Sequence, residues 1–303
     1  MRLFDRLVLE ALESVPRGRV TTYREIAVAL GDAKAARAVA EVIRIVGRRV
    51  GAPWHRAVGS RGEVAEGAAA LLKAEGVDVR GGSVEGLNRR IVRAEELGLR
   101  PVLRRMREAQ MRLSKEVSLE DRVGEPNLVA GVDVSYRWDL ASDPPVELAR
   151  AACVVLDREK SVVDGAVGEE PAPMPYVPTY LGFREFGPMS GVLRRCKFDL
   201  VMVDGHGIAH PRFFGEASHV GVCLGVPAVG VAKRRLVGHP RDGELWYLGR
   251  QVGWVVRGTW KRPIYASPGH MVSMESSLRV VLMFRESRIP EPIRLAHRLS
   301  RWG

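Results

Sequence analysis

The sequence is poor in cysteine and lacks the spacing that would make its cysteines structural. Its three cysteines, Cys153, Cys196 and Cys223, are widely separated in 303 residues, and no two of them have CxxC spacing. An odd number of isolated cysteines argues against a disulfide framework and against structural zinc. We expect them to be small buried hydrophobic residues in a reducing compartment.

Long apolar runs are missing as well. No stretch reaches the roughly 18 apolar residues of a membrane span, and the N-terminus lacks the apolar core of a signal peptide. These absences predict a cytoplasmic protein with no membrane partner. Repeats and low-complexity tracts are also absent, and 46% of the residues are hydrophobic, so most of the chain is expected to fold.

Acidic residues are outnumbered by basic ones. The chain has 36 Asp and Glu against 47 Lys and Arg, for a net charge of +11. Residues 1–100 alone carry 18 basic and 13 acidic side chains, so the excess is shared along the chain. Such a balance suits a polyanionic partner such as nucleic acid.

A loss of helical periodicity over residues 76–83 divides the chain. Before it, Thr22-Tyr23-Arg24-Glu25 forms a capping box that opens a short helix, and Asp32 can cap a second helix from Ala33 to about Val46. Two helices joined by so tight a turn predict a helix-turn-helix, with an ordinary helical hairpin as the alternative. We therefore predict a mainly helical domain of winged helix-turn-helix type in residues 1–80, a linker in 81–100 and a second domain in 101–303.

The second domain begins with strands and continues with alternating helices and strands. Short apolar, β-branched runs predict strands at Val129–Ser135, Ala151–Leu156, Ser161–Val167, Leu200–Val203 and Ala228–Val231. Helical patterns fall at Tyr180–Glu185, Arg212–Leu224 and Met274–Phe284. This order predicts an α/β domain with a mixed sheet flanked by helices.

Two of the predicted strands carry an aspartate. Asp133 lies within the first strand, and Asp204 directly follows Leu200–Val203. A single aspartate in a strand is often a hydrogen-bonded structural residue, but two in separate strands of a basic chain indicate a divalent-metal site that acts on phosphate. Further candidates are the carboxylate Glu185, the possible phosphate contact Lys233, and His210 and His270, which lie in turn-like segments.

Six motifs between residues 105 and 301 resemble the endonuclease V family. In chain order they are Gly-Val-Asp-Val-Ser, Pro-Tyr-Val-Pro, Phe-Arg-Glu, Val-Asp-Gly-His-Gly-Ile-Ala-His-Pro-Arg, Gly-Val-Ala-Lys and Ser-Pro-Gly-His. The resemblance implies a ribonuclease H-like fold and a deoxyinosine-specific DNA repair nuclease. It implies cleavage at the second phosphodiester bond 3′ to the lesion. It also implies that Asp133, Glu185 and Asp204 bind Mg²⁺, or Mn²⁺ in its place, and that Lys233 and His270 assist catalysis.

The same resemblance implies a wedge that enters the DNA and a pocket for the flipped base. In the wedge, Tyr176 would fill the gap left by the extruded base, because the prolines beside it fix the backbone. The wedge comprises Pro175, Tyr176, Val177 and Pro178, and the hypoxanthine pocket comprises Thr179, Leu181, Gly205, Gly207, Ile208 and His210. Thr179 stands where many family members have glycine.

Residues 4–77 resemble the DNA-binding half of alkylguanine-DNA alkyltransferases. The matching pieces are Pro16–Tyr23, Ala35–Val39, Pro53–Arg56 and Leu71–Gly76. The nucleophilic cysteine of that family is replaced by Trp54, whose indole cannot accept an alkyl group as a thiolate does. This departure resembles the alkyltransferase-like proteins, which bind guanine alkylated at its exocyclic oxygen without repairing it.

The resemblance also implies roles for individual residues of the first domain. Arg37 would be the finger that replaces the flipped nucleotide, and Tyr23 would help to rotate its phosphate. Trp54, His55 and Arg56 would shape the lesion site, with a role for Trp54 as core filler as the alternative. The sequence thus predicts a nuclease fused to a lesion sensor, acting on double- or single-stranded damaged DNA. The alternatives are an endoribonuclease for inosine in RNA and a non-cleaving protein that marks lesions.

Overall fold

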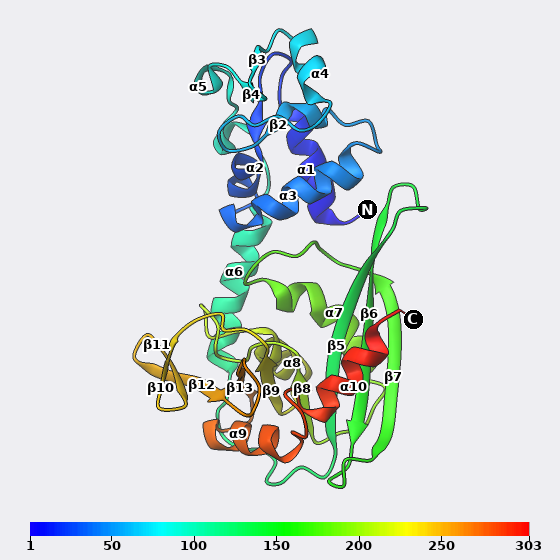
Figure 1. Cartoon of the computed structure of the whole chain (residues 1–303), viewed down its shortest axis with the longest axis vertical. Helices are drawn as coiled ribbons and strands as arrows, with labels where there is room; N and C mark the ends of the chain where they lie inside the picture. Colours follow the sequence, from blue (N-terminus) through cyan, green and yellow to red (C-terminus); the bar gives the residue numbers. More distant parts are fainter. Residues whose placement is uncertain (303) are drawn as a thin grey trace. The chain divides into compact units, whose positions relative to one another are not determined.

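The computed structural model describes residues 1–302 of the chain (Figure 1). Contacts between residues divide it into two compact units. The first unit comprises Met1–Arg107, Trp138–Val146 and Pro173–Pro178, and the second comprises Glu108–Arg137, Glu147–Ala172 and the chain from Thr179 onward. None of the helices in the described part of the chain has both the length and the apolar character needed to cross a membrane.

The first unit is mainly helical. Its helices are α1 (Leu3–Ser14), α2 (Tyr23–Ala29), α3 (Ala36–Val42), α4 (Ala68–Ala74) and α5 (Leu87–Arg90), with short 3-10 turns at Ala33–Ala35, Trp54–Arg56 and Ala94–Glu96 and a π-helical turn at Ile43–Gly47. Two pairs of short strands complete it: β1 (Thr21–Thr22) lies parallel to β2 (Ala57–Val58), and β3 (Val79–Arg80) lies antiparallel to β4 (Ser83–Val84). The long helix α6 (Val102–Leu113) continues the chain into the second unit.

Thr22 and Asp32 both cap helices as predicted, but the capping box at Thr22 is incomplete because the Glu25 carboxylate accepts from Arg93 and the Ala94 N–H instead. The Thr22 hydroxyl accepts a hydrogen bond from the backbone N–H of Glu25 at 3.0 Å, and the Asp32 carboxylate accepts one from Lys34 at 3.0 Å. The chain turns between them at Gly31, whose φ of +109° is a conformation that side chains disfavour. The predicted helix pair is therefore present, and its second member runs from Ala33 to Gly47.

Residues 81–100 lie inside the first unit, where they include β4 and α5. That they act as a linker between domains stays a prediction.

The second unit is built on a mixed sheet, which in residues 1–302 has nine strands. The order is β10-β11-β12-β13-β9-β8-β5-β6-β7, with β5, β8 and β9 parallel at its centre. The bounds are β5 (Val129–Asp139), β6 (Val146–Leu156), β7 (Val162–Pro171), β8 (Leu200–Val203), β9 (Ala228–Ala232), β10 (His239–Arg241), β11 (Glu244–Tyr247), β12 (Arg250–Val256) and β13 (Ile264–His270). The helices are α7 (Leu181–Leu193), α8 (Glu216–Leu224), α9 (Met274–Met283) and α10 (Glu291–Ser300), with a 3-10 turn at Ser114–Glu116.

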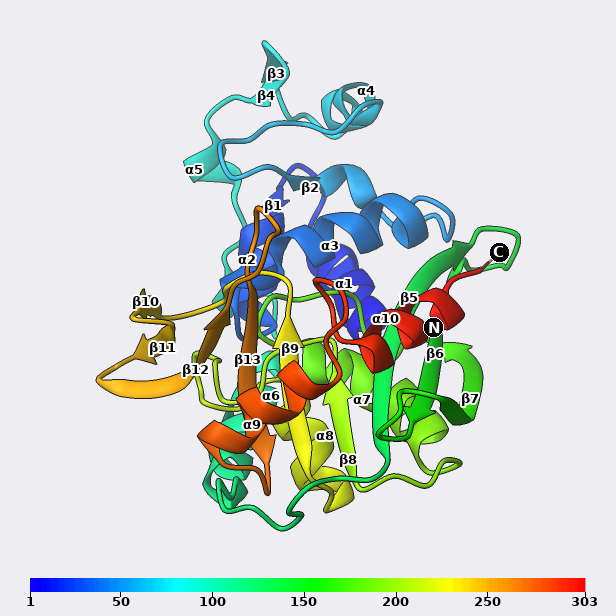
Figure 2. The same ribbon diagram turned by 60° about the horizontal axis from the view of Figure 1, so that its bottom comes forward.

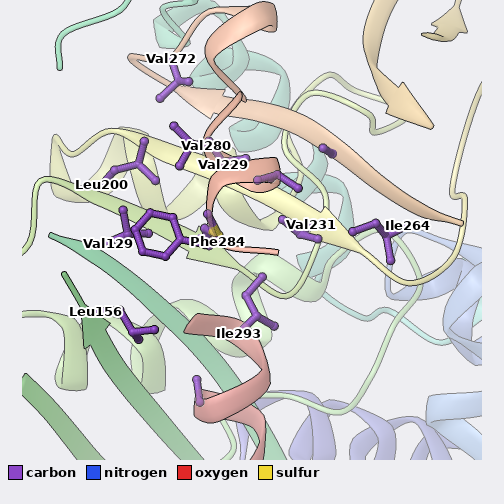
Figure 3. Packing of buried hydrophobic residues seen from close by; sticks show 14 of the residues in the cluster. Val129, Leu156, Leu200, Val229, Val231, Ile264, Val272, Val280, Phe284 and Ile293 are labelled. Atoms are coloured by element: carbon purple, nitrogen blue, oxygen red, sulfur yellow. The ribbon is translucent and has the colours of Figure 1, made fainter. Parts of the chain in front are cut away.

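The central strands are buried on both faces because successive side chains point to opposite sides of a sheet. Figure 2 shows α9 and α10 in front of the central strands and α7 and α8 behind them. On the first face Val129, Leu200 and Phe284 belong to one cluster (Figure 3), while the neighbouring positions Ala130 and Val201 pack with α7 and α8. Each such fully buried large side chain contributes about 1.5–3 kcal/mol to folding.

All five predicted strands of the second domain are present, but other elements differ from the prediction. The helix predicted at Tyr180–Glu185 begins at Leu181 and continues to Leu193. The prediction missed the outer strands β10, β11 and β12 and the helix α10.

The turn expected around His270 was wrong, because Ser267–His270 lies in β13. Proline is tolerated in this strand because β13 pairs with β12 only over Ile264–Ala266, so no backbone N–H is needed at Pro268 on that side.

Candidate active site

The parallel pairing of β5 and β8 brings the two strand aspartates together. Val132 pairs with Val203, so Asp133 and Asp204 occupy neighbouring positions at the same level of the sheet. The backbone N–H of Asp204 donates to the Val132 carbonyl at 3.3 Å. The expectation that two aspartates from separate strands share one site therefore agrees with the geometry. Asp204 directly follows the carboxyl end of β8, where α/β sheets place their chemistry, and Asp133 lies beside it within β5.

Two cationic or imidazole side chains face these aspartates. Lys233, which follows β9, forms an ion pair with Asp204. His297 of α10 lies 2.7 Å from Asp133, measured from Nδ1 to Oδ2, and the Ser300 hydroxyl donates to the same oxygen at 3.2 Å. Ligand atoms of Asp133, Asp204 and His297 all lie within 4.8 Å of one another, close enough to share one metal ion.

Two buried glutamates complete the group. Glu185 of α7 and Glu216 of α8 are 7% and 3% exposed, and the charge of Glu185 acts on Glu216. Burial raises the pKa of Glu185 to about 7, and the charge of Asp133 adds to this effect. Burial and the charge of Glu185 raise the pKa of Glu216 well above its ordinary value. Burial also raises the pKa of Asp204, although Lys233 opposes that shift.

The composition of this group fits a divalent cation. Asp133 and Asp204 lie together with His297, their charges act on Glu185 and Glu216, and Lys233 forms an ion pair with Asp204. Buried carboxylates are costly unless paired or bound to metal, and oxygen ligands are those that Mg²⁺ and Mn²⁺ prefer. The site can therefore hold the metal of a phosphoryl-transfer enzyme.

His270 is not among the residues whose ligand atoms gather here, and its catalytic role stays a prediction, while His297 and Glu216 were not predicted. His270 accepts a hydrogen bond at Nδ1 from the Ser118 backbone, 3.2 Å away, and the charge that acts on it is Arg122. His297 takes the position beside Asp133 instead. Neither His297 nor Glu216 belongs to a recognised motif, and each is a single titratable residue in a helical pattern.

The residues expected to bind the flipped base surround a strained backbone position. Thr179 has a φ of +71°, which is costly for a side chain with a branched Cβ, roughly 1–3 kcal/mol. Its carbonyl oxygen is held by Gln110, His210 and Arg212, with the shortest distance 2.6 Å from Arg212. This conformation explains why glycine suits the position.

The remaining pocket residues lie on one closely packed loop and at the start of α7. The Gly207 N–H donates to the Ser267 hydroxyl at 2.8 Å, and the Ile208 N–H donates to the Pro268 carbonyl at 2.9 Å. A Cβ placed on Gly230 of β9 would lie 2.6 Å from the Gly205 carbonyl oxygen. The loop therefore packs too closely against β9 to leave room for a side chain at Gly230. Leu181 is the first residue of α7. That these residues bind hypoxanthine stays a prediction.

The predicted wedge presents its aromatic residue to solvent. Tyr176 is 54% exposed, whereas the adjacent Val177 is 1% exposed. A buried anchor beside an exposed ring between prolines fits a rigid projection. The wedge role of Pro175–Pro178 itself remains a prediction.

The first unit contains a cavity of about 440 Å³ that gathers three of the residues expected to bind alkylated guanine. Tyr23, Arg37 and Trp54 all line it, together with Arg48, whose guanidinium lies 4.1 Å from the centre of the Trp54 indole ring. The half-buried Trp54 lines the cavity and also packs against the core cluster that contains Val58 and Leu72, so both interpretations of its role stay predictions. An aromatic wall and a positive charge suit a flipped purine.

His55 and Arg56 do not line this cavity. The Arg56 guanidinium donates to both Glu75 oxygens, at 2.8 and 3.0 Å, and to the Val15 carbonyl at 2.8 Å. His55 Nε2 lies 3.1 Å from the same carboxylate. The hydrogen bonds from Arg56 lower the pKa of Glu75 to about 2. In the structure these residues hold the domain together.

We expect Glu75→Gln to destabilise the chain at pH 7 by about 1–3 kcal/mol, since the partly buried Arg56 loses its charged acceptor. The folded pKa of Glu75 is below its ordinary value of 4.5, so its contribution is present above that pH and is lost as the pH falls toward about 2. Thermal unfolding at several pH values should therefore show a difference that shrinks in acid. The exposed Glu66→Gln is the control, and an equal melting temperature for Glu75→Gln and wild type at pH 7 would refute the prediction.

The fold and the gathered carboxylates define the class of protein as a metal-dependent nuclease on a mixed α/β sheet. The chain belongs to the endonuclease V family, whose sequence model, described as Endonuclease V, matches residues 111–298. Residues 3–77 match the model described as the DNA-binding domain of 6-O-methylguanine DNA methyltransferase. The first domain is therefore an alkyltransferase-like DNA-binding domain.

Curated relatives and solved structures agree with this assignment. Endonuclease V of Methanopyrus kandleri is 43% identical over 207 residues, covering 65% of this chain and 86% of that protein, and Endonuclease V of Xanthomonas campestris is 41% identical over 209 residues, covering 64% and 86%. The structure of Endonuclease V from Streptomyces avermitilis matches with a TM-score of 0.57 at 35% identity, covering 65% of this chain and 90% of that one. The structure of Endonuclease V from Ciona intestinalis matches with a TM-score of 0.58 at 28% identity, covering 66% of this chain and 96% of that one. That protein is in complex with a 24mer DNA containing an inosine followed by a ribo-adenosine.

Proposed function

We propose that this protein is a DNA repair endonuclease that uses Mg²⁺, or Mn²⁺ in its place, to cut DNA at the second phosphodiester bond 3′ to deoxyinosine. The observation that carries the proposal is the convergence of Asp133 within β5 with Asp204 and Lys233, which directly follow β8 and β9. The family assignment and the net charge of +11 support it.

Within the site, the chain's own residues divide the work. Asp133, Asp204 and Glu185 would hold the cation, which when bound supplies a Lewis acid for the phosphate and lowers the pKa of water. Lys233 neutralises part of the carboxylate charge and can approach a phosphate oxygen. His297 contacts Asp133 and thereby orients it, while its own side chain stays 45% exposed toward incoming DNA.

We further propose that the first domain binds guanine alkylated at its exocyclic oxygen and transfers no alkyl group. Trp54 occupies the cavity wall and offers no nucleophile, and residues 1–100 contain no cysteine.

The free cysteines elsewhere in the chain support a reducing, cytoplasmic location.

A second candidate is an endoribonuclease for inosine in RNA. The Ciona complex, in which an inosine is followed by a ribo-adenosine, favours testing it. The third, a non-cleaving lesion marker, conflicts with the intact group of Asp133, Glu185, Asp204 and Lys233.

An end-labelled duplex separates these candidates. We expect the full chain with Mg²⁺ to nick a duplex that carries one deoxyinosine at the second bond on its 3′ side, and to leave the same duplex intact in EDTA. A matched substrate with a ribonucleotide inosine and its ribose neighbours should be cut more slowly. Faster cutting of the ribo-substrate would make the protein the RNA enzyme, and binding of both without cutting would make it the lesion marker.

A further inference from the structure

The cavity of about 440 Å³ in the first unit has an excess of positive charge. Its charged lining residues are three arginines, Arg37, Arg44 and Arg48, and one glutamate, Glu41. Arginines on a DNA-binding face ordinarily serve the phosphates. One of these three is instead held over the aromatic wall of the cavity, where a phosphate contact does not account for it.

That residue is Arg48. Its guanidinium lies 4.1 Å from the centre of the Trp54 indole ring, as a cation–π pair. It donates to the Glu66 carbonyl at 2.9 Å, the one hydrogen-bond acceptor that it has in residues 1–302. A guanidinium has five N–H donors in its plane, so one that stacks on a ring by its face keeps its edge donors for a ligand.

The sequence concentrates the positive charge at Arg48. Arg37, Glu41, Arg44 and Arg48 follow one another at spacings of four, three and four positions along α3 and the π-helical turn Ile43–Gly47 that continues it. This spacing aligns side chains on one face of a helix. Glu41 is one turn from Arg37 and one turn from Arg44 but two turns from Arg48, so Arg48 is the arginine least offset by the glutamate.

The charge of Arg48 also acts on a second wall of the cavity. Burial raises the pKa of the Tyr23 hydroxyl, and Arg48 opposes that shift. Tyr23 and Trp54 both line the cavity, so a ligand between them lies within the field of this cation.

The position of Trp54 indicates which part of a lesion Arg48 meets. The nucleophile of an alkyltransferase has to contact the alkyl carbon that it attacks, and Trp54 stands at the position of that nucleophile. The alkyl group of a bound guanine therefore lies against Trp54, beside the Arg48 guanidinium. A methyl group offers this cation no hydrogen-bond acceptor, whereas an alkyl group that ends in a carboxylate offers two oxygens.

We propose that Arg48 makes the cavity selective for guanines whose alkyl group carries a negative charge, of which a carboxymethyl group on the exocyclic oxygen is the simplest. The inference rests on the lesion binding proposed above for the first domain, and it adds a substrate class and a specificity-determining residue. The guanidinium keeps its face on Trp54 and donates two N–H groups to the carboxylate, a charge-assisted pairing for which arginine is suited. The same cation offsets the repulsion between that carboxylate and the DNA phosphates.

The test compares two duplexes that differ only in the charge of the adduct. One carries O6-carboxymethylguanine and the other carries the corresponding amide, O6-carbamoylmethylguanine, which has nearly the same size and no charge. Dissociation constants are measured by fluorescence anisotropy with the full chain. Wild type should bind the carboxymethyl duplex about tenfold more tightly than the amide duplex, near the lower end of what hydrogen bonds between charged groups contribute.

The variant Arg48→Gln should bring the ratio of the two dissociation constants to about one. The matched control is Arg49→Gln, which removes the neighbouring arginine, a residue outside the cavity lining, and should keep the wild-type ratio. Circular dichroism checks that each variant folds. If Arg48→Gln does not fold, Arg48→Met, which keeps an apolar contact with Trp54, takes its place with the same expectation.

Three results would overturn the proposal: a wild-type ratio near one, an unchanged ratio in the Arg48 variant, or an equal fall of the ratio in the Arg48 and Arg49 variants. If wild type binds both adducts equally, and both more tightly than undamaged DNA, the role of Arg48 is lost while lesion binding stands. If neither adduct is bound more tightly than undamaged DNA, the proposed lesion binding itself is wrong.

Discussion

Asp204→Asn is expected to reduce nicking of deoxyinosine DNA by at least about 10³-fold, which corresponds to roughly 4 kcal/mol of transition-state stabilisation. The measurement is the single-turnover rate on an end-labelled duplex with one deoxyinosine in saturating Mg²⁺. Asparagine has the size and shape of aspartate, so the change removes one charge without opening a cavity.

The size of the effect follows from the place of Asp204 in the site. It lies at the carboxyl end of β8, next to Asp133 across the parallel pairing, and it is the ion-pair partner of Lys233. Loss of its charge removes a metal ligand and leaves Lys233 to repel the cation. Both changes weaken binding of the ion that the phosphate chemistry requires.

Asp199→Asn is the matched control, because Asp199 stands just before the other end of the same strand. Its carboxylate accepts hydrogen bonds from the backbone N–H groups of Asn127 and Leu128, at 2.8 and 2.9 Å, which an asparagine carbonyl oxygen can also accept. We expect this variant to nick at nearly the wild-type rate. Full activity in Asp204→Asn, or an equal loss in both variants, would contradict a specific role for Asp204.

The centre of the fold was predictable because its strands are buried on both faces. Such strands read as short apolar runs, and the observed bounds of β8, Leu200–Val203, are those the sequence predicts. An aspartate at the end of such a run is conspicuous, so Asp133 and Asp204 could be found without a structure. Thr179 was also conspicuous as a departure from glycine, and its φ of +71° supplies the reason.

The helical part of the site was not predictable in the same way. His297 meets Asp133 across 164 positions of sequence, and only the packing of α10 on the sheet decides which helical residue faces the aspartate. Pro292 lies in the first turn of α10, a position that proline favours, but no helix was predicted there. Glu216 gave no such signal, because a glutamate at a helix start is ordinarily a solvated residue that favours the helix dipole.

Of the outer strands that escaped prediction, β10 is short and exposed, whereas β12 has seven residues, four of which are buried. All three residues of β10 are exposed, so no apolar alternation distinguishes them from a loop. The pairing of the outer strands depends on the strands beside them, so it cannot be read from the residue pattern of each strand alone.

Combining Arg37→Ala with Trp54→Ala is expected to abolish the preference for alkylated DNA. The measurement is the ratio of two dissociation constants, for a duplex with one O6-methylguanine and for the same duplex undamaged, obtained from fluorescence anisotropy with the full chain. Stacking of a base on an aromatic ring is worth about 1–3 kcal/mol, or roughly 10- to 100-fold in affinity. The ratio should fall by about that factor and approach one.

The structure gives a reason for pairing these two residues. Both line the cavity of about 440 Å³, and Trp54 is already stacked beneath the Arg48 guanidinium, so its ring is held in place before DNA arrives. A pre-positioned ring loses little side-chain freedom on binding, which makes its contribution to affinity large. Arg37 has no ion pair in the described residues, so its charge is free to enter the base stack.

A control for general electrostatic attraction is Arg61→Ala, a residue whose side chain is 89% exposed and lies outside the cavity. Loss of a surface charge weakens binding to both duplexes equally and leaves their ratio unchanged. If the double variant kept the wild-type ratio, as Arg61→Ala is expected to do, the cavity would not recognise the lesion. The first domain would then only bind DNA through its positive charge. If the ratio of the two dissociation constants approaches one in the double variant but not in Arg61→Ala, lesion recognition belongs to the cavity. In that cavity Trp54 stands at the position of the alkyltransferase cysteine.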